Sequence, residues 1–319
     1  MSAGEGSTDS ITPRAAAPKL AVVLGTYNRL ESLKRCVASV LAQTRTPFVL
    51  YVTDAGSTDG TVEYLRAITD APVVPILVGH RLGQARAYND VFGTVTAPYV
   101  VWISDDNEIV NGGLDVAVRI LDTLPRVGMV AVKVRDVEGP SVSTPYLGAI
   151  SSIGVLNVNQ GMLRTPILQA VGGFSERFRD YGIDPDLTAK VLFSGWEIAY
   201  TRTVGIHHHR AWADGSEAGS AQRTRLQGYG KLYAEKWGTY APPDLIWRVR
   251  VLLWKAFQKA TGLGINSSRR ILGLNSRDWA NTLSGRYISL LDELQTRGKP
   301  YHLLQRAPKQ RRRLPQDPA

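Results

Sequence analysis

The feature that most constrains the fold of this chain is a regular alternation of short apolar runs and amphipathic segments between residues 19 and 134. The apolar runs are rich in β-branched residues and predict buried strands, whereas the segments between them carry apolar residues at helical spacing. Strands that are apolar throughout and alternate with helices predict a parallel sheet covered on both faces. The predicted strands are residues 20–25, 48–53, 73–78, 99–104 and 127–134, and the predicted helices are residues 30–42, 61–68, 84–95 and 114–124.

Polar clusters follow four of the predicted strands. Ligands of such sheets bind beyond the carboxyl ends of the strands, so we expect the clusters to converge on one edge and form a binding site. The four clusters are Thr26-Tyr27-Asn28-Arg29, residues 54–61, His80-Arg81-Leu82-Gly83, and Ser104-Asp105-Asp106-Asn107-Glu108.

Two of these clusters carry carboxylates with a specific chemical meaning. Asp54 can accept a hydrogen bond from the N3–H of uracil, although residues 57–59 are also typical of a plain turn that caps a helix. Asp105 and Asp106 end an apolar strand, where adjacent carboxylates repel unless a cation lies between them. Mg²⁺ or Mn²⁺ prefers such oxygen ligands and often shares them with substrate phosphates. A solvated turn is the alternative interpretation.

These clusters, in this order and spacing, resemble the inverting family 2 glycosyltransferases of the GT-A fold. The resemblance covers about residues 19–215 and continues in Gly172-Gly173-Phe174, in residues 181–187 and in His207-His208-His209. It implies an α/β fold with a Rossmann-like, mostly parallel central sheet flanked by helices, followed by a basic and mainly helical C-terminal extension. It also implies a nucleotide-sugar donor and Mn²⁺ or Mg²⁺ as cofactor.

The resemblance assigns roles to individual residues. Asp106 is the surest metal ligand, with Asp105 and His208 completing the site, and the first acidic position of the family's Asp-x-Asp motif is Ser104 here. If the segment around His208 is extended, His207 and His209 face the opposite side. The residues implied to bind the donor are Thr26, Tyr27, Asn28, Arg29, Asp54, Arg81, Asn89 and Asp105.

The expected general base is Asp184, because the family often has a Glu-Asp pair where this chain has Ile183-Asp184. Asp186 is the fallback, and Asp184 is also a natural N-cap in front of Pro185. The reaction implied is a single displacement in which an acceptor hydroxyl attacks the anomeric carbon. A UDP-sugar is the first choice of donor, with GDP- and dTDP-sugars as alternatives; the acceptor is a lipid-linked saccharide, a protein or a small molecule.

Two other functional classes remain as alternatives. A nucleotidyltransferase on a related fold would release pyrophosphate, whereas a nucleic-acid-binding protein would leave the carboxylates unexplained, since they repel phosphate backbones. An NAD-dependent dehydrogenase is disfavoured because no G-x-G-x-x-G follows the first strand.

The charge of the chain is unevenly distributed. Residues 241–319 hold 15 Lys/Arg against 5 Asp/Glu, which accounts for the whole net charge of +10. We expect a disordered leader (1–18), a catalytic domain (19–217, its nucleotide half ending near 135) and a basic helical region (218–319). A helix over 244–259 fits either an anionic membrane surface or docking on the domain. The single cysteine, Cys36, and the lack of a long apolar run favour a cytoplasmic protein, with a peripheral position at the inner membrane face as an option.

Overall fold

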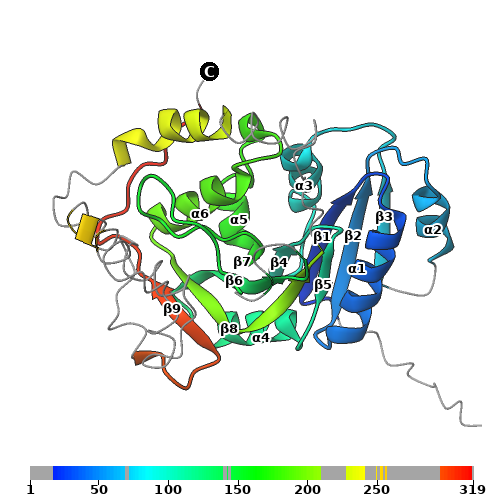
Figure 1. Cartoon of the computed structure of the whole chain (residues 1–319), viewed down its shortest axis with the longest axis horizontal. Coiled ribbons are helices and arrows are strands. Elements are labelled where there is room, and N and C mark those ends of the chain that lie inside the picture. The colour runs from blue at the N-terminus through cyan, green and yellow to red at the C-terminus, as the bar shows by residue number, and fades with distance from the viewer. Residues whose placement is uncertain are drawn as a thin grey trace, which may run out of the picture.

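The computed structural model describes residues 17–68, 72–138, 142, 145–209, 228–240, 249, 252–253, 256 and 295–317. The centre of this part of the chain is a nine-stranded sheet with the order β3-β2-β1-β4-β7-β6-β8-β5, and β9 pairs with β8. Helices cover both faces of the sheet (Figure 1). The predicted α/β class is therefore confirmed.

The first half of the sheet follows the predicted alternation closely. β1 pairs in parallel with both β2 and β4, and β2 pairs in parallel with β3. All four strands therefore end at one edge, as the apolar runs predicted. The elements are β1 (Leu20–Thr26), α1 (Leu30–Gln43), β2 (Phe48–Asp54), α2 (Thr61–Ala67), β3 (Val73–Leu77), α3 (Gln84–Phe92) and β4 (Tyr99–Trp102).

The second half makes the sheet mixed. β7 lies antiparallel between β4 and β6, whereas β6 and β8 are parallel. The short β5, which the sequence did not predict, runs antiparallel to β8. The remaining elements are β5 (Asn107–Ile109), α4 (Gly113–Thr123), β6 (Val127–Asp136), β7 (Gly161–Arg164), α5 (Thr165–Ala170), η1 (Glu176–Phe178), α6 (Ile183–Phe193), β8 (Glu197–His208), η2 (Gly238–Tyr240) and β9 (Tyr301–Gln305).

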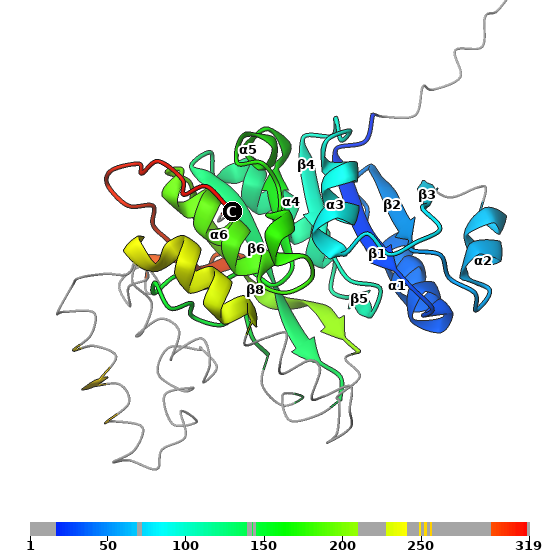
Figure 2. The same ribbon diagram turned by 90° about the horizontal axis from the view of Figure 1, so that it is seen from above.

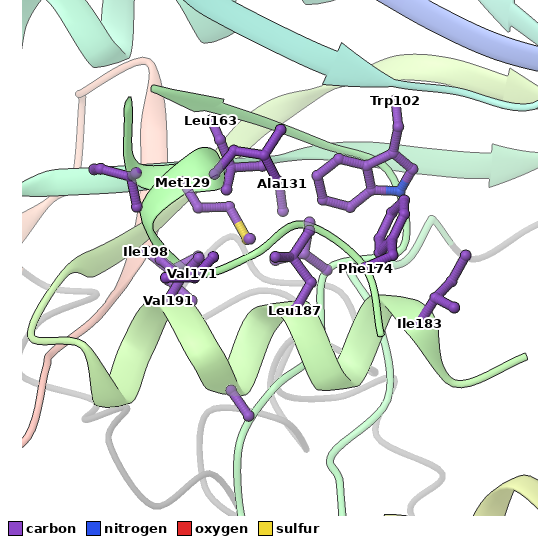
Figure 3. Packing of buried hydrophobic residues seen from close by; sticks show 14 of the residues in the cluster. Trp102, Met129, Ala131, Leu163, Val171, Phe174, Ile183, Leu187, Val191 and Ile198 are labelled. Atoms are coloured by element: carbon purple, nitrogen blue, oxygen red, sulfur yellow. The ribbon is translucent and has the colours of Figure 1, made fainter. Parts of the chain in front are cut away.

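Side chains of the central strands alternate between two buried apolar clusters, one on each face. One cluster packs against α1, α2 and α4, and the other against α3, α5 and α6. Figure 3 shows the second cluster, in which Leu187 and Val191 of α6 face Met129 and Leu163 of the sheet. Trp102 belongs to the same cluster and lies at its end nearest the carboxyl edge.

The outer side of α6 is covered by a helix over residues 228–237, which runs beside it (Figure 2). Trp237 is fully buried there and stacks on Phe193 with ring centroids 5.6 Å apart. Its indole Nε1 donates to Asp186 Oδ1 at 2.8 Å. This second layer explains why α6 is apolar on nearly every side, since it is buried from both directions.

The C-terminal segment returns to the sheet. β9 pairs antiparallel with β8, and Arg306 Nη1 lies 3.2 Å from Glu197 Oε1 at the start of β8. The expectation of a separate, mainly helical region after residue 217 is therefore wrong for residues 301–305. The amphipathic helix expected over 244–259 lies outside the described residues except for 249, 252, 253 and 256, which are helical. Among the described helices, none is both long and apolar enough to cross a membrane.

Candidate functional site

A cavity of about 540 Å³, here called the main cavity, opens at the carboxyl ends of β1, β2, β3 and β4. All four polar clusters contribute to its wall, so the predicted convergence at one edge is observed. Loop residues before α6 and the end of β8 close the other side. Its lining includes Thr26, Tyr27, Arg29, Ala55, Arg81, Tyr88, Trp102, Asp105, Asp106, Asn159, Tyr181, Asp184 and His208.

The adjacent carboxylates Asp105 and Asp106 are bridged by the guanidinium of Arg29. Its Nη1 lies 3.0 Å from Asp105 Oδ1 and 3.1 Å from Asp106 Oδ2. Thr26 Oγ1 donates to the second oxygen of Asp105 at 2.9 Å. The sequence predicted that a cation must separate the two carboxylates, and in this structure Arg29 from the β1–α1 loop supplies it.

The two carboxylates differ in their acidity. Burial raises the pKa of Asp105, and the attraction of Arg29 offsets this only in part, since the negative charge of Asp106 adds to the rise. Burial also acts to raise the pKa of Asp106, but hydrogen bonding and charge from His208 and Arg29 outweigh it and lower the pKa. Asp106 is thus the carboxylate that stays ionised most readily.

His208, at the end of β8, lies between two carboxylates. Its Nε2 is 3.3 Å from Asp106 Oδ1, and its Nδ1 is 3.3 Å from Asp136 Oδ1 at the end of β6. Tyr146 Oη also donates to Asp136 Oδ1, at 2.9 Å. A carboxylate on one ring nitrogen orients an imidazole and leaves the other nitrogen for a metal ion. The neighbouring histidines face away, as expected, since His209 Nε2 lies 2.8 Å from Glu108 Oε2.

The residues at this wall fit a divalent ion. Asp106 offers a carboxylate oxygen and His208 an imidazole nitrogen, a donor set that suits Mn²⁺ and is tolerated by Mg²⁺. Within the described part of the chain, no cluster of three or more His, Cys, Asp or Glu forms a complete site. An ion bound here would therefore need further oxygens, which a substrate diphosphate can supply.

Asp184 also lines the main cavity. Trp102 Nε1 donates to its Oδ1 at 3.1 Å. The predicted capping role is wrong: Gly182 is the N-cap of α6, its φ of 86° suits glycine, and Asp184 lies inside the first turn. Burial raises the pKa of Asp184 to about 7, with the Trp102 hydrogen bond acting in the opposite direction.

Asp186, the fallback base, is fully buried and does not line the main cavity. Its Oδ1 lies 2.8 Å from Lys236 Nζ and accepts from Trp237 Nε1, and its Oδ2 lies 3.4 Å from Lys190 Nζ. This carboxylate joins α6 to the helix over residues 228–237. The geometry thus places the two aspartates, which the sequence ranked as first choice and fallback, in different surroundings.

Asn28 joins the loop after β1 to the loop after β2, and Asp54 holds the second loop together internally. Asn28 has a φ of 50°, and its Oδ1 accepts from the backbone N–H of Thr58 at 2.8 Å. Asp54 is buried, and its Oδ2 accepts from the backbone N–H groups of Gly56 and Ser57 at 2.8 and 3.0 Å. Its Oδ1 is buried without a hydrogen-bond partner among the described residues.

Tyr27 and Arg81 form the rim of the main cavity beside these loops. The guanidinium carbon of Arg81 lies 4.8 Å from the centre of the Tyr27 ring. Both side chains are exposed at the cavity mouth, where a planar ligand can contact them.

Asn89 does not line the main cavity, and neither do Asn28 and Asp54, so the place of these three residues in the donor site stays a prediction. Its Nδ2 donates to the carbonyl of Phe174 at 2.8 Å, and its Oδ1 accepts from the N–H of Phe174 at 2.9 Å. A Cβ on Gly173 would lie 2.5 Å from Asn89 Oδ1, so the Gly172-Gly173-Phe174 turn fits closely over this amide. Asn89 therefore fastens that turn to α3.

Three residues of the site were missed in the sequence. Trp102 was taken only as part of a strand, and Tyr146 stands in no motif. Asp136 carried a usable signal, because it ends an apolar strand just as Asp54 does and the same edge argument applies to it.

Comparisons with known proteins agree with this geometry. The sequence profile described as glycosyl transferase family 2 matches residues 21–173. An N-acetylglucosaminyl-diphospho-decaprenol L-rhamnosyltransferase of Mycobacterium tuberculosis is 26% identical over 245 residues, which cover 63% of this chain and 79% of that protein. An O-antigen biosynthesis protein of Myxococcus xanthus is 25% identical over 62% of this chain and 18% of its own.

Two solved structures share the fold. A mannosyltransferase of Pyrobaculum calidifontis in complex with GDP-Man and Mn²⁺ has a TM-score of 0.53 and 21% identity, over 69% of this chain and 64% of that chain. TarS of S. aureus in complex with UDP-GlcNAc has a TM-score of 0.50 and 18% identity, over 61% of this chain and 60% of that chain. At these identities the two matches show the fold alone.

Replacing Asn89 tests whether this residue holds the Gly172-Gly173-Phe174 turn or binds the donor. Asn89→Ala leaves the N–H and the carbonyl of Phe174 without their partner, which should cost about 1–3 kcal/mol of unfolding free energy in urea titrations. Calorimetric affinity for UDP should not change. Weaker UDP binding with unaltered stability would place Asn89 in the donor site.

Replacing Arg29 tests the bridge between the carboxylates. Arg29→Met keeps an unbranched stem but removes the guanidinium and leaves Asp105 and Asp106 to repel each other, so the thermal midpoint should fall. Millimolar Mn²⁺ should raise that midpoint more in Arg29→Met than in the wild type, because the ion supplies the missing positive charge. Arg29→Lys, which keeps the charge, is the control and should respond as the wild type does. Equal Mn²⁺ responses in all three proteins would exclude this role.

Proposed function

Because the chain belongs to glycosyl transferase family 2, we propose that it moves a sugar from a nucleotide-sugar donor to an acceptor hydroxyl, with inversion at the anomeric carbon. The observation that carries this proposal is the main cavity itself. One wall presents Asp106, His208 and Arg29, which suit a diphosphate and its metal ion. Asp184, a carboxylate whose pKa of about 7 suits a general base, lines the same cavity.

We propose a UDP-sugar as the donor. A buried oxygen without a hydrogen-bond partner is uncommon, and among the described residues Asp54 Oδ1 is such an atom. The N3–H of uracil is a donor of the right kind for it, and Ala55, the residue that follows Asp54, lines the main cavity. TarS, with the same fold, is solved with UDP-GlcNAc.

Asp106 and His208 are the residues that would hold Mn²⁺ or Mg²⁺. When bound, the ion supplies positive charge to the departing diphosphate. The mannosyltransferase with the same fold is solved with Mn²⁺, which supports this assignment. Arg29 adds a fixed guanidinium to the same wall, and guanidinium groups pair well with phosphate oxygens.

Asp184 would take the proton of the acceptor hydroxyl as that oxygen attacks the anomeric carbon. Its Oδ1 is held by Trp102, which leaves Oδ2 to face the hydroxyl. Asp184 lies on a helix whose Leu187 and Val191 are anchored in the core, so its position is set by packing rather than by a loop (Figure 3). An attack on the face of the anomeric carbon opposite the departing diphosphate would invert its configuration.

The proposal is tested by product analysis. A panel of nucleotide-sugars is incubated with the protein and Mn²⁺, with and without EDTA, and the released nucleotide is identified. Release of UDP from a UDP-sugar, lost in EDTA, is the expected outcome. Pyrophosphate release from a nucleoside triphosphate, with no turnover of any sugar donor, would instead indicate a nucleotidyltransferase.

Asp184→Asn should lower the turnover number by about 10²–10⁴ while UDP binding is kept, because the amide cannot accept the proton. In the wild type, turnover should rise with pH and level off above about 7, where Asp184 is deprotonated. A turnover number that Asp184→Asn leaves unchanged would mean that another group deprotonates the acceptor.

The same substitution should change stability in a pH-dependent manner. The folded pKa of Asp184, about 7, lies above the unfolded value of about 3.9, so its stabilising contribution is present at low pH and lost as pH rises through 7. Asp184→Asn should therefore melt at a higher temperature than the wild type at pH 8.5, with a smaller difference at pH 5.5. Asp186→Asn is the contrast: it weakens a buried ion-pair network and should destabilise the protein at both pH values.

The carboxylate behind His208 provides a test of the metal site that does not depend on turnover. Asp136→Asn removes the charge that orients the imidazole and should weaken Mn²⁺ binding in the presence of UDP by about 10–100-fold, measured by electron paramagnetic resonance. Glu108→Gln is the matched control, because Glu108 lies on the neighbouring strand β5 and contacts His209 instead of His208. This variant should bind Mn²⁺ as the wild type does. Identical affinities in both variants would place the ion elsewhere.

A further inference from the structure

A second cavity of about 420 Å³, here called the side cavity, adjoins the main cavity. The two share Arg81, Gly83, Asp180 and Tyr181 as lining residues, so they are continuous at this border. The remaining wall of the side cavity comes from Phe178, Arg179, Gly228, Tyr229 and Leu232. Part of it therefore belongs to the helix over residues 228–237, which lies beyond the segment matched by the family profile.

Tyr229 is held close to the proposed base. A Cβ on Gly182 would lie 1.9 Å from Tyr229 Cδ2, so the ring rests directly on the backbone of Gly182, two residues before Asp184. The rings of Tyr229 and Phe178 meet edge to face with centroids 6.0 Å apart. Burial and the charges of Asp184 and Asp186 raise the pKa of the Tyr229 phenol, in agreement with this proximity.

The opposite wall is fixed by backbone contacts to α3. Asp180 Oδ1 accepts from the N–H of Gln84 at 2.9 Å, and the carbonyl of Arg179 accepts from the N–H of Ala85 at 2.7 Å. Arg179 Nε lies 3.4 Å from Asp180 Oδ2, so the two charges largely offset each other. The side cavity thus combines aromatic faces with a polar border, to which Arg81 adds a positive charge.

This combination selects a class of ligand. One face of a sugar ring carries C–H groups that pack on aromatic rings, while its hydroxyls need donors and acceptors at the edge. A polyprenyl chain would make no polar contact with Arg81, Arg179 and Asp180, whereas the hydroxyls of a sugar can. A volume of about 420 Å³ lies within the usual range of small-ligand pockets.

We propose that the side cavity is the acceptor subsite, and that it binds the saccharide ring whose hydroxyl is glycosylated, with Tyr229 and Tyr181 as its aromatic walls. This inference rests on the proposed glycosyl transfer. A ring seated there borders the main cavity beside Asp184, where its hydroxyl loses the proton and forms the new bond to the anomeric carbon. The departing nucleoside diphosphate carries the electron pair of the broken bond.

The test uses methyl glycosides of common hexoses, deoxyhexoses and N-acetylhexosamines as probes. Their binding to the full chain is measured by saturation-transfer NMR without donor, and their effect on UDP release is measured with a UDP-sugar and Mn²⁺. At least one glycoside should bind and be glycosylated. Tyr229→Leu and Tyr181→Leu should each raise its Michaelis constant about tenfold, the equivalent of roughly 1.4 kcal/mol of lost stacking.

Two variants make the comparison specific. Tyr229→Phe keeps the ring and should bind the glycoside as the wild type does. Tyr64→Leu, a similar change on α2, should leave both measurements unaltered. Because Tyr181 lies on a different element from Tyr229, a shared effect of the two leucine variants cannot result from poor docking of one helix.

The outcomes separate this inference from the proposed function. If UDP release from the donor is seen but no glycoside binds, or binding is insensitive to both leucine variants, the side cavity is not the acceptor subsite. If a glycoside binds in a Tyr229-dependent manner but no donor is turned over, the proposed function fails and the saccharide site stands. Dodecyl glycosides test whether a lipid tail is recognised. If a dodecyl glycoside binds more tightly than its methyl counterpart, and both leucine variants bind it as tightly as the wild type, the alkyl chain and not the sugar ring is bound. That outcome would overturn the assignment of the side cavity to a saccharide.

Discussion

Four aspartates lie at or just beyond the carboxyl ends of three strands, so one edge of the sheet carries several negative charges. The arrangement of the other site residues depends on how each of these charges is compensated. Asp54 is compensated by backbone N–H groups, Asp105 and Asp106 by Arg29, and Asp136 by Tyr146 and His208. The compensating groups come from different loops and strands. Because buried carboxylates are unfavourable without such partners, folding of these loops and assembly of the cavity are the same process.

The aspartates of α6 show how one helix serves stability and chemistry at once. Asp186 points outward into Lys190, Lys236 and Trp237 and fastens the covering helix, whereas Asp184 points into the main cavity and keeps only the Trp102 hydrogen bond. The raised pKa of Asp184 is the result of that sparse environment. The near-neutral pKa of this proposed base therefore depends on the burial of its carboxylate.

The covering helix also gives the site a second compartment. It brings Tyr229 onto Gly182, and a side chain at position 182 would leave no room for that ring. The glycine thus has two functions: it adopts the left-handed conformation that begins α6, and it lets an aromatic ring approach the base. The border between the two cavities lies along this contact and the loop of Asp180 and Tyr181.

The sequence by itself determined the order of strands and helices through residue 134, apart from β5, and the convergence of four polar clusters at one edge. These follow from local periodicity and from the rule that parallel strands end together, neither of which needs distant contacts. The candidates Asp106, His208 and Asp184 came from the resemblance to family 2 glycosyltransferases. Only the tertiary structure decided that Arg29 lies between the carboxylates, that Asn89 fastens a turn, and that β9 returns to the sheet. It also separated Asp184 from Asp186, because their partners Trp102 and Trp237 lie 82 and 51 residues away and no local pattern encodes which aspartate each indole reaches.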